Sequence, residues 1–221
     1  MKLFFPVLLV FLFASAYLDA AENAKYEQAD TTQTNVPPSA EVPDSGVMPL
    51  SAFFGADNAF PPLANRRICE GAAGGDGMPL VFSHQLDIST LQPGDFRITR
   101  ADGSIGSLVC VTPMPALDEG ELRTILLIGE YGSAENQPVQ VDIVGNLLSI
   151  DGSLNFRNSS STVIALEEGP TLIYAEVVPE SQRDLGKELS TGLRFGAPGN
   201  GCPERTQQVV RVVWTGGITK P

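Results

Sequence analysis

A single histidine, His84, limits the acid–base and nucleophilic chemistry that this chain could perform. A Ser-His-acid mechanism would have to use it, with Ser83 and Asp87 as the nearest partners along the sequence. In a regular strand, Ser83 and His84 would point to opposite faces, which makes Ser83 a poor nucleophile. We therefore interpret His84 as a polar residue at a strand end and assign no catalytic residue.

Carboxylates are the second possible source of catalysis, since the chain has 26 Asp and Glu residues. The candidates are Glu119, Glu121, Glu130, Glu167, Glu168 and Glu176. A glycoside hydrolase needs two carboxyl groups about 5 to 10 Å apart beside the bound sugar. Trp214 is the only Trp and there are four Tyr, so aromatic rings for stacking on a sugar are few. Solvated surface charges are the favoured interpretation, and a small secreted hydrolase is the alternative.

The Gly-rich stretch Cys69–Gly77 resembles a loop that could hold a phosphate or a calcium ion. It lacks the Gly-Lys-Ser/Thr of a P-loop and the tandem copies of calcium-binding repeats. We predict a flexible loop with no metal or cofactor. Calcium-stabilised loops around Asp76 and Asp102 are a further alternative.

Four residues are candidates for covalent modification. Asn158 begins an Asn-X-Ser sequon, which would carry a glycan only in a eukaryotic source. Three cysteines, Cys69, Cys110 and Cys202, are spaced too widely for a zinc module. In an oxidising compartment two of them are expected to pair, leaving one over.

The first 16 residues have the order of a secretory signal peptide. Lys2 precedes an uncharged apolar run, and Ala14-Ser15-Ala16 supplies the small residues of a cleavage site. The run is roughly 12 residues, whereas a membrane-spanning helix needs about 20. We predict a secreted, extracellular or cell-surface protein with no membrane span after cleavage.

The charge of the chain limits its partners. A formal net charge of −12 and a pI near 4.4 disfavour nucleic acid and anionic lipid, which bind Lys and Arg. An extracellular protein or polysaccharide is the expected partner.

The elements that must position these residues are strands. Residues 17–47 are rich in Pro, Thr, Gln, Glu and Ala, which predicts a disordered linker, and 48–65 is a lead-in segment. Residues 66–221 contain short β-branched or apolar runs between turn residues, which predicts a single all-β domain. The expected strands are 80–83, 96–99, 108–112, 124–128, 139–144, 162–165, 172–177 and 209–214. The one expected helix is 180–190.

Four short motifs within residues 81–103 have a characteristic spacing: Phe82-Ser83, Asp87–Leu91, Phe96–Thr99 and Asp102-Gly103. Over about residues 78–146 the chain resembles the Ig-like domains of bacterial surface and S-layer proteins. The resemblance implies an Ig-like β-sandwich with an adhesive or scaffolding role. The chain departs from that family in its cysteines and in its extension beyond Asn146.

The resemblance also implies a disulfide. The first and last strands of such sandwiches commonly lie side by side, which would place Cys69 and Cys202 at the same end. We expect these two to pair, with Cys110 packed as a free thiol in an apolar strand. A Cys69–Cys110 bridge is the competing possibility, if the loop before Met78 folds back. The expected function is non-catalytic binding, adhesion or structural display outside the cell.

Overall fold

The structure is a computed structural model that describes residues 29–114, 120–165, 168, 171–183 and 205–215. Strands dominate these residues, so the predicted all-β class is confirmed. The strands are β1 (Pro49–Phe53), β2 (Asp76–Phe82), β3 (Phe96–Arg100), β4 (Ser107–Thr112), β5 (Thr124–Glu130), β6 (Pro138–Ile143), β7 (Ser160–Ile164), β8 (Thr171–Val177) and β9 (Val210–Thr215). The helical elements are α2 (Ala64–Arg67) and the 3-10 turns η1 (Ser39–Glu41), η2 (Ile88–Thr90), η3 (Pro93–Asp95) and η4 (Glu180–Gln182).

All eight strands expected from the sequence are present, because each expected range overlaps one of β2 to β9. Strand β1 was not expected: it lies in the segment interpreted as a lead-in. Of the expected helix 180–190, the structure has the single turn η4, and residues from 184 onward lie outside the described part.

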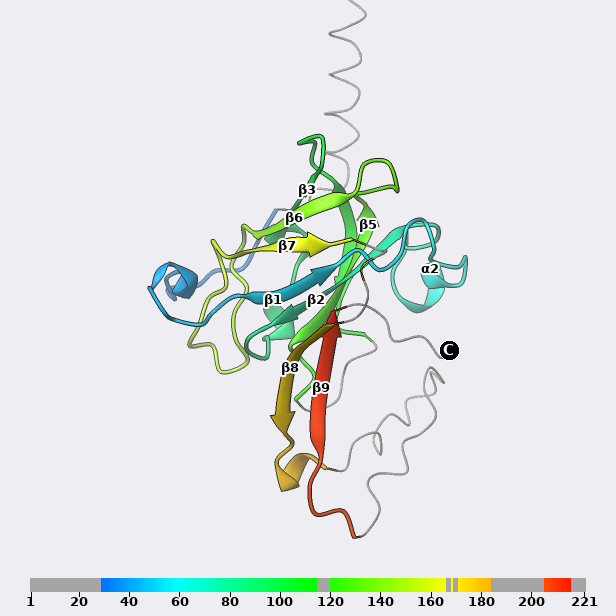
Figure 1. Cartoon of the computed structure of the whole chain (residues 1–221). Helices are drawn as coiled ribbons and strands as arrows, with labels where there is room; N and C mark the ends of the chain where they lie inside the picture. The colour runs from blue at the N-terminus through cyan, green and yellow to red at the C-terminus, as the bar shows by residue number, and fades with distance from the viewer. Residues whose placement is uncertain (1–28, 115–119, 166–167, 169–170, 184–204, 216–221) are drawn as a thin grey trace, which may run out of the picture.

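Strand β1 joins two groups of strands into one seven-stranded sheet, in the order β3-β6-β7-β1-β2-β5-β4 (Figure 1). It pairs antiparallel with β2 and parallel with β7, and every other pairing in this sheet is antiparallel. The edge strands β3 and β4 are consecutive in the chain. Gly106 N donates to Ile98 O at 2.9 Å beside the turn between them, so the sheet curls until its two edges approach each other.

The hydrophobic core lies between these two groups of strands. Both contribute fully buried residues, such as Leu80 and Leu127 from one and Ile98 and Val141 from the other. Phe82 packs edge-on against Phe156, with ring centroids 5.0 Å apart. Burial of apolar surface on this scale is the main force that holds such a sheet together.

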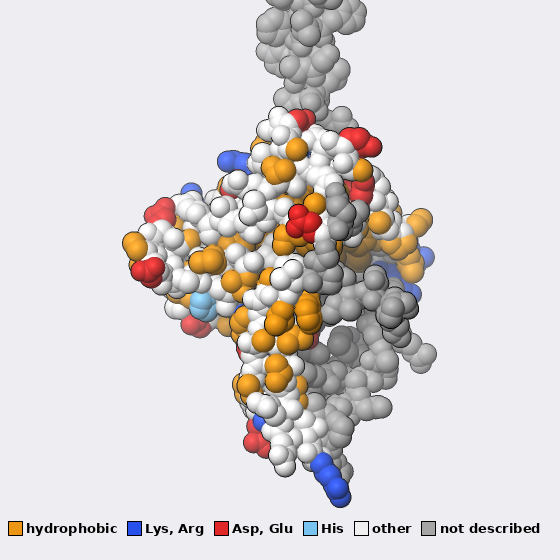
Figure 2. All heavy atoms as spheres, viewed as in Figure 1, with side chains coloured by type: hydrophobic (Ala, Val, Ile, Leu, Met, Phe, Trp, Pro, Cys, Tyr) orange, Lys and Arg blue, Asp and Glu red, His pale blue; other side chains and the backbone are white. Residues whose placement is uncertain are grey.

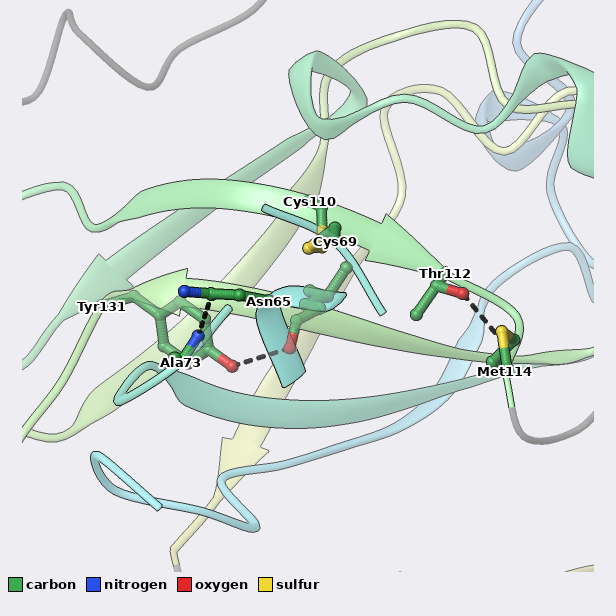
Figure 3. The surroundings of a disulfide bond; sticks show 8 residues. Asn65, Cys69, Ala73, Cys110, Thr112, Met114 and Tyr131 are labelled. Atoms are coloured by element: carbon green, nitrogen blue, oxygen red, sulfur yellow. Dashed lines mark hydrogen bonds between the residues drawn. A yellow bond between two sulfur atoms is a disulfide. The ribbon is translucent and has the colours of Figure 1, made fainter. Parts of the chain in front are cut away.

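A disulfide fastens the Gly-rich loop to the edge of the sheet (Figure 3). It joins Cys69, just after α2, to Cys110 in β4, with Cα atoms 6.7 Å apart. The loop lies close to the strand: at Gly71, where φ is +88°, a Cβ would be 2.8 Å from Val109 Cγ1. Only glycine fits both this backbone conformation and this approach.

The predicted pairing of Cys69 with Cys202 is therefore wrong, and Cys110 is not a free thiol. The turn of α2 directs the chain back over β4, where Asn65 Oδ1 accepts a hydrogen bond from Ala73 N at 2.7 Å (Figure 3). This folding back was the condition for the competing Cys69–Cys110 bridge. Cys202 itself lies outside the described residues.

Residues 30–41, which we name the N-terminal strap, run along the surface of the body in a fixed path. Asn155 Nδ2 donates to Val36 O at 3.0 Å, and Ser39 N donates to Asn155 O at 2.9 Å. The prediction of a disordered linker is thus wrong for residues 29–47, while 17–28 lie outside the described part. Composition failed here because polar contacts, which hydropathy does not register, hold the strap.

Within the described ranges, no helix has the length and hydropathy needed to cross a membrane. The predicted signal peptide, residues 1–16, lies outside these ranges.

Candidate functional site

The structure brings Ser83 and His84 together, contrary to the expectation that they face opposite ways. Ser83 Oγ lies 3.0 Å from His84 Nδ1 and accepts a hydrogen bond from Met48 N at 3.1 Å. The alternation argument does not apply because β2 ends at Phe82, and both residues lie in the bend that follows. His84 is exposed at this strand end.

Among the residues that the structure describes, no third group orients the imidazole of this pair. The nearest candidate, Asp87, caps η2 instead, and its Oδ1 accepts from Ser89 N at 3.0 Å and from Ser89 Oγ at 2.6 Å. No hydrogen bond among the described residues joins His84 to a carboxylate. Since a Ser-His pair depends on such a group for the correct tautomer, the geometry favours the structural interpretation of His84.

The candidate glutamates have separate roles. Glu130 ends β5, where burial and the neighbouring Asp76 raise its pKa. Glu176 lies in β8 and is bound between arginines. Glu121 precedes β5, Glu168 is exposed beyond β7, and Glu119 and Glu167 lie outside the described residues.

The two candidate calcium loops use their carboxylates within the fold. Asp76 is fully buried and accepts backbone hydrogen bonds from Asn58, Tyr131 and Gly132 at 2.8 to 3.0 Å. Asp102 accepts from Ser104 N and Oγ in the β3–β4 turn, which lowers its pKa. In the described ranges, no three His, Cys, Asp or Glu side chains converge as a metal site would require.

Asn158, the first residue of the sequon, is exposed in a turn with φ of +68°. Its Nδ2 donates to Glu41 Oε1 of the strap. A glycan on this nitrogen would replace that hydrogen bond.

The feature that sequence reasoning missed is the two-stranded sheet of β8 and β9, which we name the ribbon. It projects from the body in Figure 1. Its solvent-exposed side, the outer face, is formed by three cross-strand pairs of apolar residues: Leu172 with Trp214, Ala175 with Val212, and Val177 with Val210. The five large side chains have exposed fractions of 39 to 56%. Figure 2 shows hydrophobic side chains gathered along the ribbon.

A β-bulge makes this face continuous. Residues 172 and 175 would point to opposite sides in a regular strand, since side chains alternate. The register shifts between Leu172 and Tyr174, so Leu172 joins Ala175 on the outer face. Bulges commonly redirect a side chain in this way near functional surfaces.

The opposite side of the ribbon, the inner face, pairs Tyr174 with Val213 and Glu176 with Arg211, and it is attached to the body through Glu176. Arg211 Nη1 lies 2.8 Å from Glu176 Oε1, and Arg123 Nη2 lies 3.6 Å from Oε2. Tyr174 donates its hydroxyl to Oε2 at 2.6 Å. Partial burial disfavours the charge of Glu176, but the hydrogen bonds from Tyr174 and Arg211 and the two guanidiniums outweigh it, so its pKa is lowered.

Arg123 connects this face to the core. Its guanidinium lies 4.1 Å from the centroid of the Tyr174 ring, and its Nη1 donates to Ser83 O at 2.8 Å. The residue comes from the loop before β5 and is almost fully buried. It therefore joins the ribbon to the end of β2, and a cation held over an aromatic ring adds to this attachment.

The ribbon thus presents its apolar pairs to water and keeps its charged side chains on the covered side, whereas a half-exposed sheet usually places its polar side in water. Contiguous exposed apolar surface on a soluble protein marks an interaction site or an aggregation hazard. In the sequence, the signal for this face was the nearly uninterrupted apolar run Val209–Trp214, which shows no alternation that could assign faces.

Compared with protein-family models, curated proteins and solved structures, the chain has no match, so its function has to be inferred from its own residues.

Proposed function

We propose that this chain is an exported, non-catalytic Ig-like β-sandwich that binds a partner protein through the outer face of the ribbon. The observation that carries the proposal is the three exposed apolar pairs of that face. An isolated two-stranded sheet is marginally stable in water, and half-exposed apolar pairs stabilise it only weakly. Their placement is explained by burial in a complex.

The strand order supports the Ig-like assignment. In constant-type Ig domains, strands A, B, E and D form one sheet and C, F and G form the other. Numbered along this chain, β1-β2-β5-β4 corresponds to the first group and β3-β6-β7 to the second. Tyr131, at the corner between β5 and β6, donates its hydroxyl to Leu127 O at 3.0 Å, much as the corner tyrosine of such domains does.

Two features depart from that pattern. The disulfide joins the loop before β2 to β4, whereas the bridge of antibody domains links the two sheets through B and F. The ribbon follows the seventh strand as an addition. The addition carries the proposed binding surface.

Export is supported by the signal-like order of residues 1–16 and by the disulfide, since such bonds persist mainly in oxidising compartments. A protein partner is preferred to a polysaccharide because the outer face is mostly aliphatic, with Trp214 as its one aromatic residue. Aliphatic surface gains more from an apolar protein surface than from hydroxyl-rich sugar.

The experiment compares binding of the purified chain to intact cells of its source. The double variant V210T/V212T keeps β-branched side chains and removes apolar groups from the outer face. We expect its binding to fall at least about tenfold, equal to ~1.4 kcal/mol, with an unchanged melting temperature.

Val139→Thr is the matched control, because Val139 is a separate exposed valine on β6. It should bind like the wild type. Equal binding by V210T/V212T and the wild type would refute the ribbon as the binding surface. Absence of cleavage after Ala16, measured by mass spectrometry of the secreted chain, would refute the export route.

A further inference from the structure

The N-terminal strap is held to the body beside a buried carboxyl group. Asp30 Oδ2 accepts from Asn146 N at 3.0 Å and from Asn146 Nδ2 at 3.2 Å. Thr31 N donates to Gln92 Oε1 at 3.0 Å, and Gln92 Nε2 donates to Thr32 Oγ1 at 2.6 Å. The start of the strap therefore depends on Gln92 and Asn146.

Asp95 contacts both Gln92 and Gly145, the neighbour of Asn146. Its Oδ2 accepts from Gln92 N at 2.8 Å, and its backbone oxygen accepts from Val144 N at 2.7 Å. Gly145 allows the carboxyl group to fit, because a Cβ there would lie 2.2 Å from Asp95 Oδ1. Asp95 thus packs against Gly145, directly beside Asn146, the residue that binds Asp30.

The second oxygen of Asp95 is not satisfied. Asp95 is fully buried, and Oδ1 has no hydrogen-bond partner among the described residues. A buried carboxylate with an unbonded oxygen is costly, whereas the protonated acid carries no net charge. The pocket therefore suits the acid form.

The charged surroundings act in the same direction. Asp30, from the strap, is the charged group that acts on Asp95 from outside its own turn, and it raises the pKa. Strand β4, which packs on η3, carries no ionisable side chain except Cys110, which is held in the disulfide. Arg97 and its register partner Asp142 follow on β3 and β6, and Arg97 is exposed. Burial first and Asp30 next outweigh the hydrogen bond from Gln92, so the pKa rises from 3.8 to about 7.

We propose that the N-terminal strap is a pH-sensitive latch, docked while Asp95 is protonated and loosened when Asp95 ionises beside Asp30. Undocking moves Asp30 away and opens Asp95 to water, which relieves both the repulsion and the burial of the charge. Docking and proton binding at Asp95 therefore favour each other. The strap is released at pH values between the ordinary pKa of a carboxyl group and neutrality, and its docking is weakest above that pH range.

The test is hydrogen–deuterium exchange of the full chain, with each rate divided by the intrinsic rate at the same pH. Between about pH 5 and pH 7, we expect protection of residues 30–41 to fall at least fivefold, within the limit of about tenfold per pH unit for one proton. Above about pH 8 it should level off. The amides of β5 serve as the internal reference and should not change.

Asp95→Asn should remove the dependence and keep the strap protected at both pH values. Should that variant not fold, Asp30→Asn provides the second test: it keeps an acceptor for Asn146 but removes the repelling charge, so the midpoint should move to lower pH. Asp102→Asn, in an exposed turn, is the control and should behave like the wild type. Equal strap protection at both pH values in the wild type, or an unshifted midpoint in Asp30→Asn, would overturn the proposal.

Discussion

The N-terminal strap and the ribbon each have a carboxylate of shifted pKa where they meet the seven-stranded sheet, but the charges beside the two carboxylates differ in sign. Asp95 under the strap faces another carboxylate, Asp30, and its pKa is raised. Glu176 in the ribbon lies between Arg123 and Arg211, and its pKa is lowered. Rising pH should thus loosen the strap, and falling pH should loosen the ribbon.

The comparison shows that two carboxylates can give the attachment of two segments opposite dependence on pH. The sign is decided by the neighbours and not by the carboxylate itself. In the ribbon, this polar attachment turns the apolar side outward. In the strap, polar contacts replace the apolar burial that composition reasoning looks for.

The largest expected effect comes from Arg123→Ala. The change leaves Glu176 without one of its cations and removes the contact with the Tyr174 ring. Arg123 is almost fully buried, and loss of its charged hydrogen bond to Ser83 O together with its contact with the ring should cost about 4 kcal/mol, or roughly 10 °C in melting temperature for a chain of this size. Arg97→Ala, at an exposed arginine of β3, should change stability by less than about 0.5 kcal/mol. Thermal unfolding and exchange of β8–β9 measure both, and equal losses in the two variants would contradict the role of Arg123.

Removing the disulfide should weaken the sheet while leaving both attachments in place. The bridge closes a loop between residues 41 apart, so C69S/C110S should lower the free energy of unfolding by about 4 kcal/mol. Denaturant unfolding measures the loss, and exchange at the strap and ribbon should show no selective release. Cys202→Ser is the matched control. A loss of similar size in that variant would contradict the Cys69–Cys110 pairing.

Asp95→Asn should change how stability depends on pH. A carboxyl pKa raised in the folded state means that stability is highest at acid pH and falls as pH rises toward about 7. Between about pH 5 and pH 7 the wild type should lose about 2 kcal/mol relative to the variant, which lacks this proton. Denaturant unfolding at the two pH values gives the difference. The same change of stability with pH in the wild type and in Asp95→Asn would contradict the role given to Asp95.

Glu176→Gln should have the smallest effect and the opposite sign of pH dependence. Because the pKa of Glu176 is lowered on folding, its stabilisation is present above its ordinary value of 4.5 and is lost as pH falls through the lowered pKa. Near neutral pH the variant should lose about 1 kcal/mol, since the side chain is partly exposed. In acid the wild type should approach the variant. Exchange at β8–β9 measures this, and a ribbon that tightens on acidification would contradict the assignment.

Local sequence patterns were sufficient to locate most strands, but they did not predict which strands pair with one another. β-branched runs between turn residues located β2 to β9, because strand formation depends on residues close together in the chain. Strand β1 was missed because it begins at Pro49 within a segment read as a lead-in. Its place in the sheet comes from pairing with β2 and β7.

Side-chain contacts were either predicted wrongly from the sequence or not predicted at all. Alternation placed Ser83 and His84 on opposite faces, but the strand ends one residue earlier. No signal joined Asp30 to Asn146 or Glu176 to Arg123, since each pair is separated by more than fifty residues.

The sequence by itself determined the all-β class, the positions of eight strands and a net charge of −12. These properties follow from composition and from short-range periodicity. Only the tertiary structure decided that Cys69 pairs with Cys110, that the strap is ordered, and that the ribbon presents its apolar side to water. Each of these depends on which distant segments meet, and a period of two residues marks the two faces of a strand without saying which one is covered.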